Sequence, residues 1–175
     1  MLRTIVHVYL GGGFIYSVKG YDQERYGSNP RWSLAVGTGL SLSSKTFLIA
    51  KVGYLFHHEF KNGSTVPSTV EYSWEHLLVS IGVMYKIPVR DYFDINIDAG
   101  VSWLGFFGNN YLGDLVKPND SFLPEFVGFG LERPLGNKEW SIFAEMDYET
   151  LAIRSSSKSF NGFSTIGGIK YYFGR

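Results

Sequence analysis

Three acidic side chains, Glu145, Asp147 and Glu149, occupy alternate positions in the stretch "WSIFAEMDYET". In an extended strand this spacing places all three carboxylates on one face, at steps of about 7 Å. Carboxylate pairs at such separations work as acid and base or nucleophile in glycoside hydrolases. Those enzymes also need a cleft that encloses a sugar, which a narrow strand barrel lacks. We therefore interpret the carboxylates as counter-charges of lysines and expect no catalytic residue.

Metal ligation is the second chemistry that the residue types suggest. His57, His58 and His76 lie with Glu71 in two successive segments, and a zinc site needs at least three converging protein ligands. Pairing of these segments about the centre of their hairpin sets His76 about four residues from His57, or about 13 Å along the strand. Cysteine, the other common ligand, is absent. We expect no metal site and no cofactor.

Eight segments alternate between apolar and polar residues with turn residues between them, the pattern of β-strands. None shows a sustained apolar period of 3.6, so we expect almost no helix. Most segments span about 10–14 residues, longer than the usual strand of about 5–6 residues and enough for a tilted membrane-spanning strand of about 9–11 residues. The predicted strands are Thr4–Ser17, Trp32–Leu42, Thr46–Phe56, Tyr72–Ile87, Tyr92–Phe107, Phe122–Arg133, Trp140–Glu149 and Gly162–Phe173.

The connections between these segments alternate in length. Three are short: "SLSSKT", "KIPVRDY" and "RPLGNKEW". Four are longer and more polar: "VKGYDQERYGSNPR", "HHEFKNGSTVPSTVE", "GNNYLGDLVKPNDS" and "TLAIRSSSKSFN". In an up-and-down barrel the short turns fall at one end and the long loops at the other, which is typical of outer-membrane barrels.

Composition narrows the class of protein further. Lys+Arg and Asp+Glu number 16 each, so no net field favours binding to nucleic acid. No run of about 18 apolar residues occurs, which excludes a transmembrane helix. The first residues, "MLRTIVHVYLGGGF", alternate into glycines and lack the apolar core of a signal peptide. We expect either a chain that is not exported or a mature form carrying an added start methionine.

The stretch "YFDINIDAGVSW" raises the question of which strand face points inward. Its odd positions, Phe93 to Trp103, are all apolar, and its even positions are polar or small. The interior of an eight-stranded barrel is just wide enough to be filled by side chains, and the apolar faces would crowd it with large aromatic rings. Rings also gather near strand ends, as in the aromatic girdles of membrane barrels. We predict that the apolar faces contact lipid; the alternative is a soluble lipocalin-like carrier with an apolar lumen.

Because alternate residues of a strand point to opposite faces, the outward apolar positions also determine which side chains enter the lumen. Ionised groups in a narrow interior need partners, so we predict an ion-pair network. Residues of the fourth and fifth strands whose numbers add up to about 180 should pair. This register sets Lys86 opposite Asp94. The third and seventh strands are diametrically opposed, which predicts a central bridge between Lys51 and Glu145. The predicted network comprises Lys51, Lys86, Asp94, Asp98, Glu145 and Lys170, within a lumen that also holds His7, Tyr9, His76, Asn96, Glu132, Asp147, Glu149 and Tyr172.

The eight strands, the one-sided tight turns and the last strand "FSTIGGIKYYF" resemble OmpA/OmpX-type outer-membrane barrels. The aromatic ending is similar to the signal by which the assembly machinery takes up such barrels, except that Gly174 and Arg175 follow Phe173. Some small barrels are enzymes. PagL-type lipid A deacylases carry His and Ser two residues apart on a lipid-facing strand, where this chain has Asp147 and Glu149. Without a nucleophile and base, acyl transfer there is not supported.

The sequence therefore predicts an all-β protein, a single domain over residues 1–175, forming a monomeric eight-stranded antiparallel up-and-down transmembrane β-barrel of the bacterial outer membrane. The predicted function is non-enzymatic: an envelope anchor, a surface-interaction protein or an accessory barrel of a larger complex. Its expected partners are outer-membrane lipid and lipopolysaccharide, with surface or envelope proteins meeting the long loops and no nucleic acid. A lipid A-modifying hydrolase is the enzyme alternative.

Overall fold

The computed structural model describes residues 4–20, 31–62, 69–89, 92–107, 121–136, 139–152 and 159–174. They form strands and short turns, and no helix long and apolar enough to cross a membrane occurs among them. The strands are β1 (Val6–Gly20), β2 (Arg31–Ser41), β3 (Thr46–Asn62), β4 (Thr69–Val89), β5 (Phe93–Phe107), β6 (Ser121–Phe122), β7 (Glu125–Pro134), β8 (Trp140–Ala152) and β9 (Ser159–Phe173).

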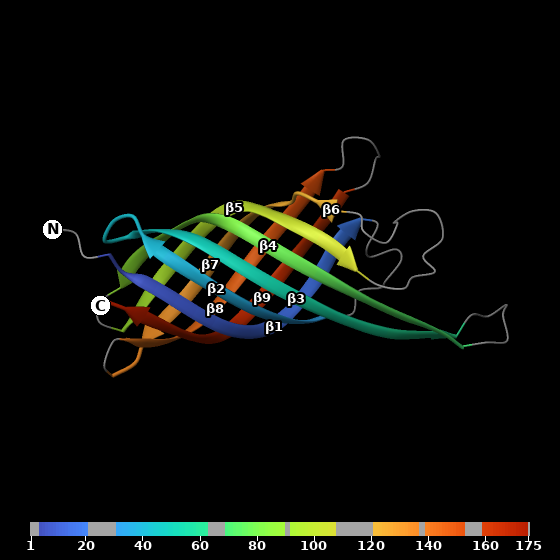
Figure 1. Cartoon of the computed structure of the whole chain (residues 1–175), viewed down its shortest axis with the longest axis horizontal. Coiled ribbons are helices and arrows are strands. Elements are labelled where there is room, and N and C mark those ends of the chain that lie inside the picture. Colours follow the sequence, from blue (N-terminus) through green and yellow to red (C-terminus); the bar gives the residue numbers. More distant parts are fainter. Residues whose placement is uncertain are drawn as a thin grey trace.

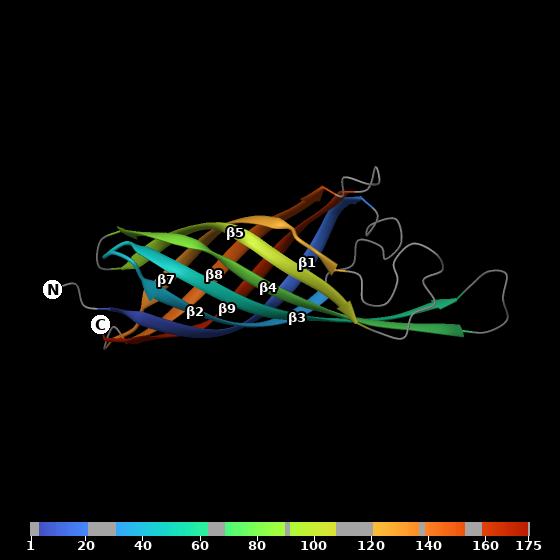
Figure 2. The ribbon, with the colours of Figure 1, turned by 45° about the horizontal axis from the view of Figure 1, so that its top comes forward.

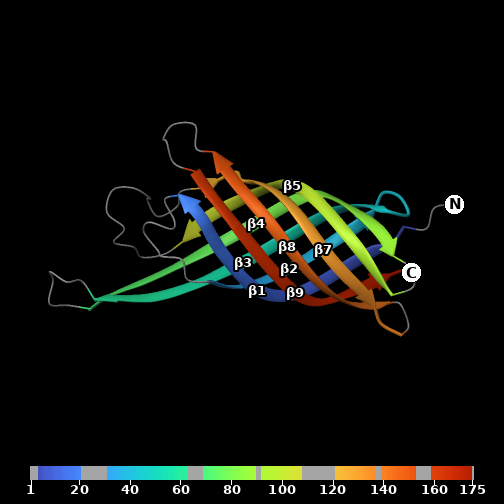
Figure 3. The same cartoon turned by 180° about the vertical axis from the view of Figure 1, so that it is seen from behind.

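The strands close into an antiparallel up-and-down barrel (Figures 1 and 3). Strands that follow one another in the chain pair with each other, except that β6 and β7 both pair with β5. β1 closes the ring by pairing with β9 from Val6↔Phe173 to Gly20↔Phe160. This register shifts once, between Ser17 and Lys19. Closure leaves no strand edge in the wall of the barrel, which a membrane-spanning sheet requires because lipid cannot satisfy backbone hydrogen bonds.

The short β6 and the following β7 are one wall strand of the barrel. Both pair with β5 in the same register, Leu104↔Phe122 on one side of the break and Val101↔Glu125 on the other. The interruption falls at Pro124, which has no N–H to donate to the ladder. Its carbonyl still accepts a hydrogen bond from the Ser102 N–H at 2.7 Å. Counted in this way the wall has eight strands, as the sequence predicts.

The β3–β4 hairpin is longer than predicted. Its pairing runs from Thr46↔Tyr85 to Asn62↔Thr69, so most of the stretch that was expected to be a long loop is strand. The segments "HHEFKN" and "TVEYSW" carry the aromatic and β-branched residues that favour strands, and each supplies hydrogen bonds to the other. We name residues 57–62 and 69–74 the ribbon, because β2 pairs with β3 only up to Phe56 and β5 with β4 only up to Glu75.

The two ends of the barrel differ. The short connections that follow β2, β4 and β7 lie at one end together with both chain termini, and we name this the turn end (Figure 1). The ribbon projects from the opposite end, the loop end, past the ends of the other strands (Figure 2).

Alternation decides which side chains face outward. Along β7 every odd position from Glu125 to Arg133 is exposed and every even position from Phe126 to Glu132 is buried. The exposed positions of the wall are mainly apolar, for example Leu34 at 53%, Val101 at 51% and Phe129 at 47%. The prediction that the apolar faces point outward is confirmed, and the apolar lumen of the soluble-carrier alternative is contradicted by the buried lysines and carboxylates, such as Lys51, Asp98 and Glu132.

Aromatic rings pack in pairs on the outer face near the strand ends. At the turn end Tyr171 packs between Trp140 and Phe173, with ring centroids 4.8 Å apart in both pairs. Toward the loop end Phe14 packs on Trp32 at 4.2 Å. Such rings have an apolar body and a polar edge, which suits the two boundaries between hydrocarbon and water.

Candidate functional site

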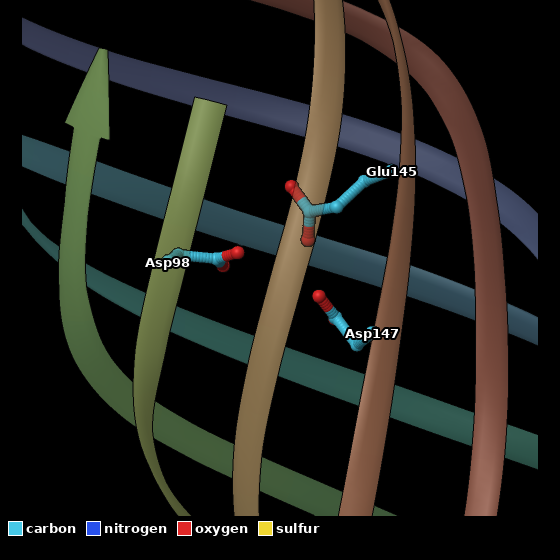
Figure 4. Close-up of side chains that lie close together, drawn as sticks. All are labelled: Asp98, Glu145 and Asp147. Carbon is cyan, nitrogen blue, oxygen red and sulfur yellow. The ribbon is translucent and has the colours of Figure 1, made fainter. Parts of the chain in front are cut away.

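The charged lumen of the barrel is the candidate site, and its centre is the side chain of Lys51 on β3. The Lys51 Nζ donates hydrogen bonds to Asp98 Oδ2 at 2.6 Å, to Asp147 Oδ2 at 3.1 Å and to Glu145 Oε1. Lys51, Asp98 and Asp147 are each under a tenth exposed. Figure 4 shows that the three carboxylates point toward one another from β5 and β8. We name these four residues the central cluster.

Strand order explains how these four residues meet. β3 and β8 are diametrically opposed in a ring of eight wall strands, so the Lys51–Glu145 pair crosses the lumen. Asp98 and Asp147 flank Gly128, which pairs with both of them in the ladder. A Cβ on Gly128 would lie 1.9 Å from Asp98 Oδ1 and 2.2 Å from Asp147 Oδ1. The missing side chain of this glycine is therefore the space into which the two carboxylates extend.

A second group of charges, the turn-end cluster, surrounds Glu132 on β7, whose side chain is completely buried. Glu132 Oε1 accepts a hydrogen bond from Lys86 Nζ at 2.9 Å, and Oε2 accepts one from Lys170 Nζ at 3.0 Å. The Tyr172 hydroxyl donates to Glu132 Oε1 at 2.6 Å and accepts from Lys86 Nζ at 2.6 Å. Because β4 and β9 are opposite strands of the ring, this last contact also crosses the lumen.

The expected register between β4 and β5 is wrong by two residues. In the structure, paired residues of β4 and β5 have numbers that add up to 182, so Lys86 pairs with Asn96 and Asp94 pairs with Pro88. Lys86 Nζ nevertheless lies 3.2 Å from Asp94 Oδ2, because a lysine side chain is long enough to reach a diagonal neighbour on the same face. Asp94 pairs directly with Glu132 on β7, which brings both carboxylates to the same lysine.

The sequence-predicted lumen residues are thus brought together in two groups. Lys51 meets Glu145 and Asp98 in the central cluster, while Lys86, Lys170 and Asp94 gather around Glu132. The sequence-based network omitted Glu132, Asp147 and Tyr172, although parity already assigned all three to the lumen. Their partners could be found only by aligning the registers of non-adjacent strands.

The lumen is less uniformly polar than predicted. Apolar side chains also point inward and form two small clusters, one with Phe47, Ile49, Met84 and Phe126 and the other with Tyr9, Ala35 and Phe143. The lysines lie against these rings: Lys51 Nζ is 5.0 Å from the centroid of Phe126, and Lys170 Nζ is 5.1 Å from that of Phe143. Cation–π contacts at these distances add to the ion pairs.

The oxygens of Asp98, Glu145 and Asp147 lie within 4.8 Å of one another, which is close enough for one metal ion. The cation that they hold, however, is the ammonium of Lys51, which contacts all three. The side chains of His57, His58 and His76 lie outside the described residues. The backbone register sets Leu55 opposite His76, so His57 is two residues from that position and not four as expected.

Asp147 and Glu149, the two residues that the sequence comparison set against the PagL-type His and Ser, face the lumen. Asp147 is 5% and Glu149 7% exposed, so both point away from lipid. The outward residues of the same segment are Met146, Tyr148 and Thr150. These side chains contain neither a histidine base nor an acidic partner for one, so they do not form a Ser–His type of nucleophile.

No protein-family model matches the chain. No curated protein matches it either. Solved structures do match: the crystal structure of Neisserial surface protein A (NspA) superposes with a TM-score of 0.68 at 12% identity, over 97% of both chains. The outer-membrane protein OprG from Pseudomonas aeruginosa superposes with a TM-score of 0.66 at 10% identity, over 99% of this chain and 97% of OprG.

The outer-membrane enzyme PagL also superposes, with a TM-score of 0.54 at 13% identity over 94% of this chain and 98% of PagL. At these identities the likeness concerns the fold. The fold is that of the small OmpA/OmpX-type barrels, and the location that belongs to this fold is the bacterial outer membrane. Because PagL shares it, the fold leaves open whether the chain is an enzyme.

Proposed function

We propose that this chain is a non-enzymatic outer-membrane barrel that anchors the ribbon at the cell surface, where the ribbon and the neighbouring loops meet a surface or envelope partner. The observation that carries the proposal is the ribbon itself. β3 and β4 continue for six residues each beyond their pairing with β2 and β5. At about 3.3 Å per residue the ribbon extends about 20 Å past the wall, farther than closure of the barrel requires.

The closely packed side chains of the lumen favour a function as an anchor over a function as a channel. The Lys51–Glu145 and Lys86–Tyr172 contacts join opposite walls at two levels, and aromatic side chains fill the space around them. An eight-stranded barrel has little interior beyond the volume of its own side chains. We therefore expect no stepwise ion conductance in planar bilayers.

The outer wall supports lipid and lipopolysaccharide as the surroundings of the barrel. Its exposed apolar side chains and paired rings match hydrocarbon and interface respectively. The inward orientation of Asp147 and Glu149 argues against deacylation of lipid A at this wall, since a hydrolase of that kind must present its nucleophile to lipid. Incubation of the folded barrel with lipopolysaccharide should release no fatty acid.

The test of the proposal is site-specific photo-crosslinking in living cells. A photoreactive residue at Phe60, in the ribbon, should give adducts of discrete mass and should be accessible to a membrane-impermeant reagent. The same residue at Leu135, in the turn after β7, is the matched control and should give neither. If Phe60 is inaccessible in intact cells, or forms no adduct there, the ribbon is not the working surface.

A further inference from the structure

The two charged clusters of the lumen differ in their net charge. In the turn-end cluster, Lys86 and Lys170 face two carboxylates, those of Asp94 and Glu132. Among the side chains that the structure describes, the positive and negative charges of this cluster are therefore equal.

The central cluster has an excess of negative charge. Lys51 faces three carboxylates, and a fourth, Glu149, follows Asp147 on the same face of β8. Glu149 is 7% exposed and has no cationic partner among the side chains that the structure describes. This part of the lumen thus holds one lysine and four carboxylates, three of which contact the lysine. Uncompensated charge in such an interior is strongly unfavourable.

A small cavity lies beside these carboxylates on the loop-end side of Lys51. Its volume is about 20 Å³, and its polar lining comprises Ser33, Lys51, Ser80, Asp147, Glu149 and Ser164. A cavity of this size holds one water molecule or one ion. Two carboxylates and three hydroxyls therefore surround a space for a single small guest.

An independent feature of this cavity points to a guest. Ser33 on β2, across the lumen from Glu149, is 5% exposed, and its Oγ has no hydrogen-bond partner. Asp147 also lines the cavity, while its Oδ2 contacts Lys51 and its Oδ1 lies over Gly128. Buried polar atoms are nearly always paired, so the Ser33 hydroxyl is available to a guest in this cavity.

We propose that this cavity binds a divalent cation of the Ca²⁺ class, coordinated by Asp147, Glu149 and the Ser33 hydroxyl. Carboxylate and hydroxyl oxygens are ligands for hard cations. Ca²⁺ accepts irregular arrangements of oxygen ligands, whereas Mg²⁺ demands a near-ideal octahedron. Its two charges, with that of Lys51, reduce the negative excess of the four carboxylates to one.

The proposed ion and Lys51 occupy adjacent places in the lumen. The ammonium fills the space between Asp98, Glu145 and Asp147. Glu149 and Ser33 lie one layer nearer the loop end, since Glu149 follows Asp147 along β8 and Ser33 stands close to the start of β2. Binding at this place leaves the contacts of Lys51 intact, and Asp147 joins the two cations.

The test is equilibrium dialysis of radioactive Ca²⁺ against the full chain, refolded in non-ionic detergent without lipopolysaccharide, whose phosphates would bind Ca²⁺. We expect one Ca²⁺ per barrel and a higher midpoint of thermal unfolding in Ca²⁺ than in chelator. Glu149→Gln should lower the affinity about tenfold or more, and Ser33→Ala should lower it without changing any charge.

Glu125→Gln is the matched control. Glu125 stands on the outer face of β7 and pairs with Thr150, the residue that follows Glu149 on β8. Its replacement therefore removes one negative charge at the same level of the barrel, but on the outer face and not in the lumen. Its Ca²⁺ affinity should equal that of the wild type. Two results would overturn the proposal: a wild-type barrel that binds no Ca²⁺ because protons alone neutralise the carboxylates, or a folded Glu149→Gln variant that binds Ca²⁺ as well as the wild type does.

Discussion

Lys51 and Glu145 are separated by 94 positions in the chain, yet their side chains form an ion pair across the lumen. They stand on opposite wall strands, and Asp98 and Asp147 complete the coordination of the same ammonium. The pair therefore joins two walls that share no backbone hydrogen bond. Contacts inside the lumen therefore contribute to the stability of the barrel, and Lys51 and Glu145 contribute unequally.

The first prediction is that Lys51→Met destabilises the barrel far more than Glu145→Met. Loss of the lysine leaves three buried carboxylates without a cation, which costs about 3–5 kcal/mol. Loss of Glu145 leaves Lys51 with two aspartates. Urea unfolding in detergent, followed by tryptophan fluorescence, measures both variants.

The double variant isolates the coupling of this pair. Removing Glu145 from the Lys51→Met background relieves repulsion, so the double variant should be more stable than the sum of the single effects predicts, by about 0.5–3 kcal/mol. If the effects of the two single substitutions simply add in the double variant, Lys51 and Glu145 do not form a stabilising ion pair in the folded barrel.

The second prediction concerns the lipid-facing wall. Ile97 is 44% exposed on the outer face of β5, about midway through a membrane-spanning length measured from the turn end. Ile97→Arg should cost about 2–4 kcal/mol in bilayers and reduce the heat-dependent mobility shift on denaturing gels. Leu135→Arg, at the turn, is the control and should cost about 0–1 kcal/mol. Equal tolerance of both changes would contradict the assignment of this face to lipid.

The third prediction uses two adjacent glycines of β9. A Cβ on Gly168 would lie 2.1 Å from the Leu10 carbonyl oxygen, whereas one on Gly167 would lie 3.6 Å from its nearest neighbour, the Phe143 carbonyl oxygen. Gly168→Ala should force β1 and β9 apart, at about 1–3 kcal/mol. Gly167→Ala should be neutral or stabilising by up to about 1 kcal/mol, since alanine loses less backbone entropy on folding. Equal unfolding midpoints for the two variants would show that β1 and β9 are not so close.

The fourth prediction compares neighbouring tyrosines. The Tyr172 hydroxyl is buried between Glu132 and Lys86, whereas that of Tyr171 is exposed and lies 3.5 Å from a Glu139 oxygen. Tyr172→Phe should destabilise by about 1–3 kcal/mol, because it leaves buried charged groups short of a partner. Tyr171→Phe should change the free energy of unfolding by less than about 0.5 kcal/mol. The opposite ranking would mean that the turn-end cluster is solvated and not packed as described.

The alternation of residues such as Ile97 and Asp98 determined the fold class and the orientation of each face. Side chains in a strand alternate between two faces with a period of two, so one contrast between lipid and lumen orients a whole strand. The number of wall strands followed from the same pattern. These features are local, because each depends only on residues a few positions apart.

The contacts inside the lumen were decided by the tertiary structure. Which lysine meets which carboxylate depends on the registers of several strands together, and the register error of two residues at Lys86 shows how easily local reasoning misplaces a partner. The hub at Glu132 and the close approach of Asp98 and Asp147 over Gly128 join strands that are not neighbours in the chain. The sequence by itself determined which side chains enter the lumen, and only closure of the barrel decided which of them meet, because closure sets the heights of opposite walls.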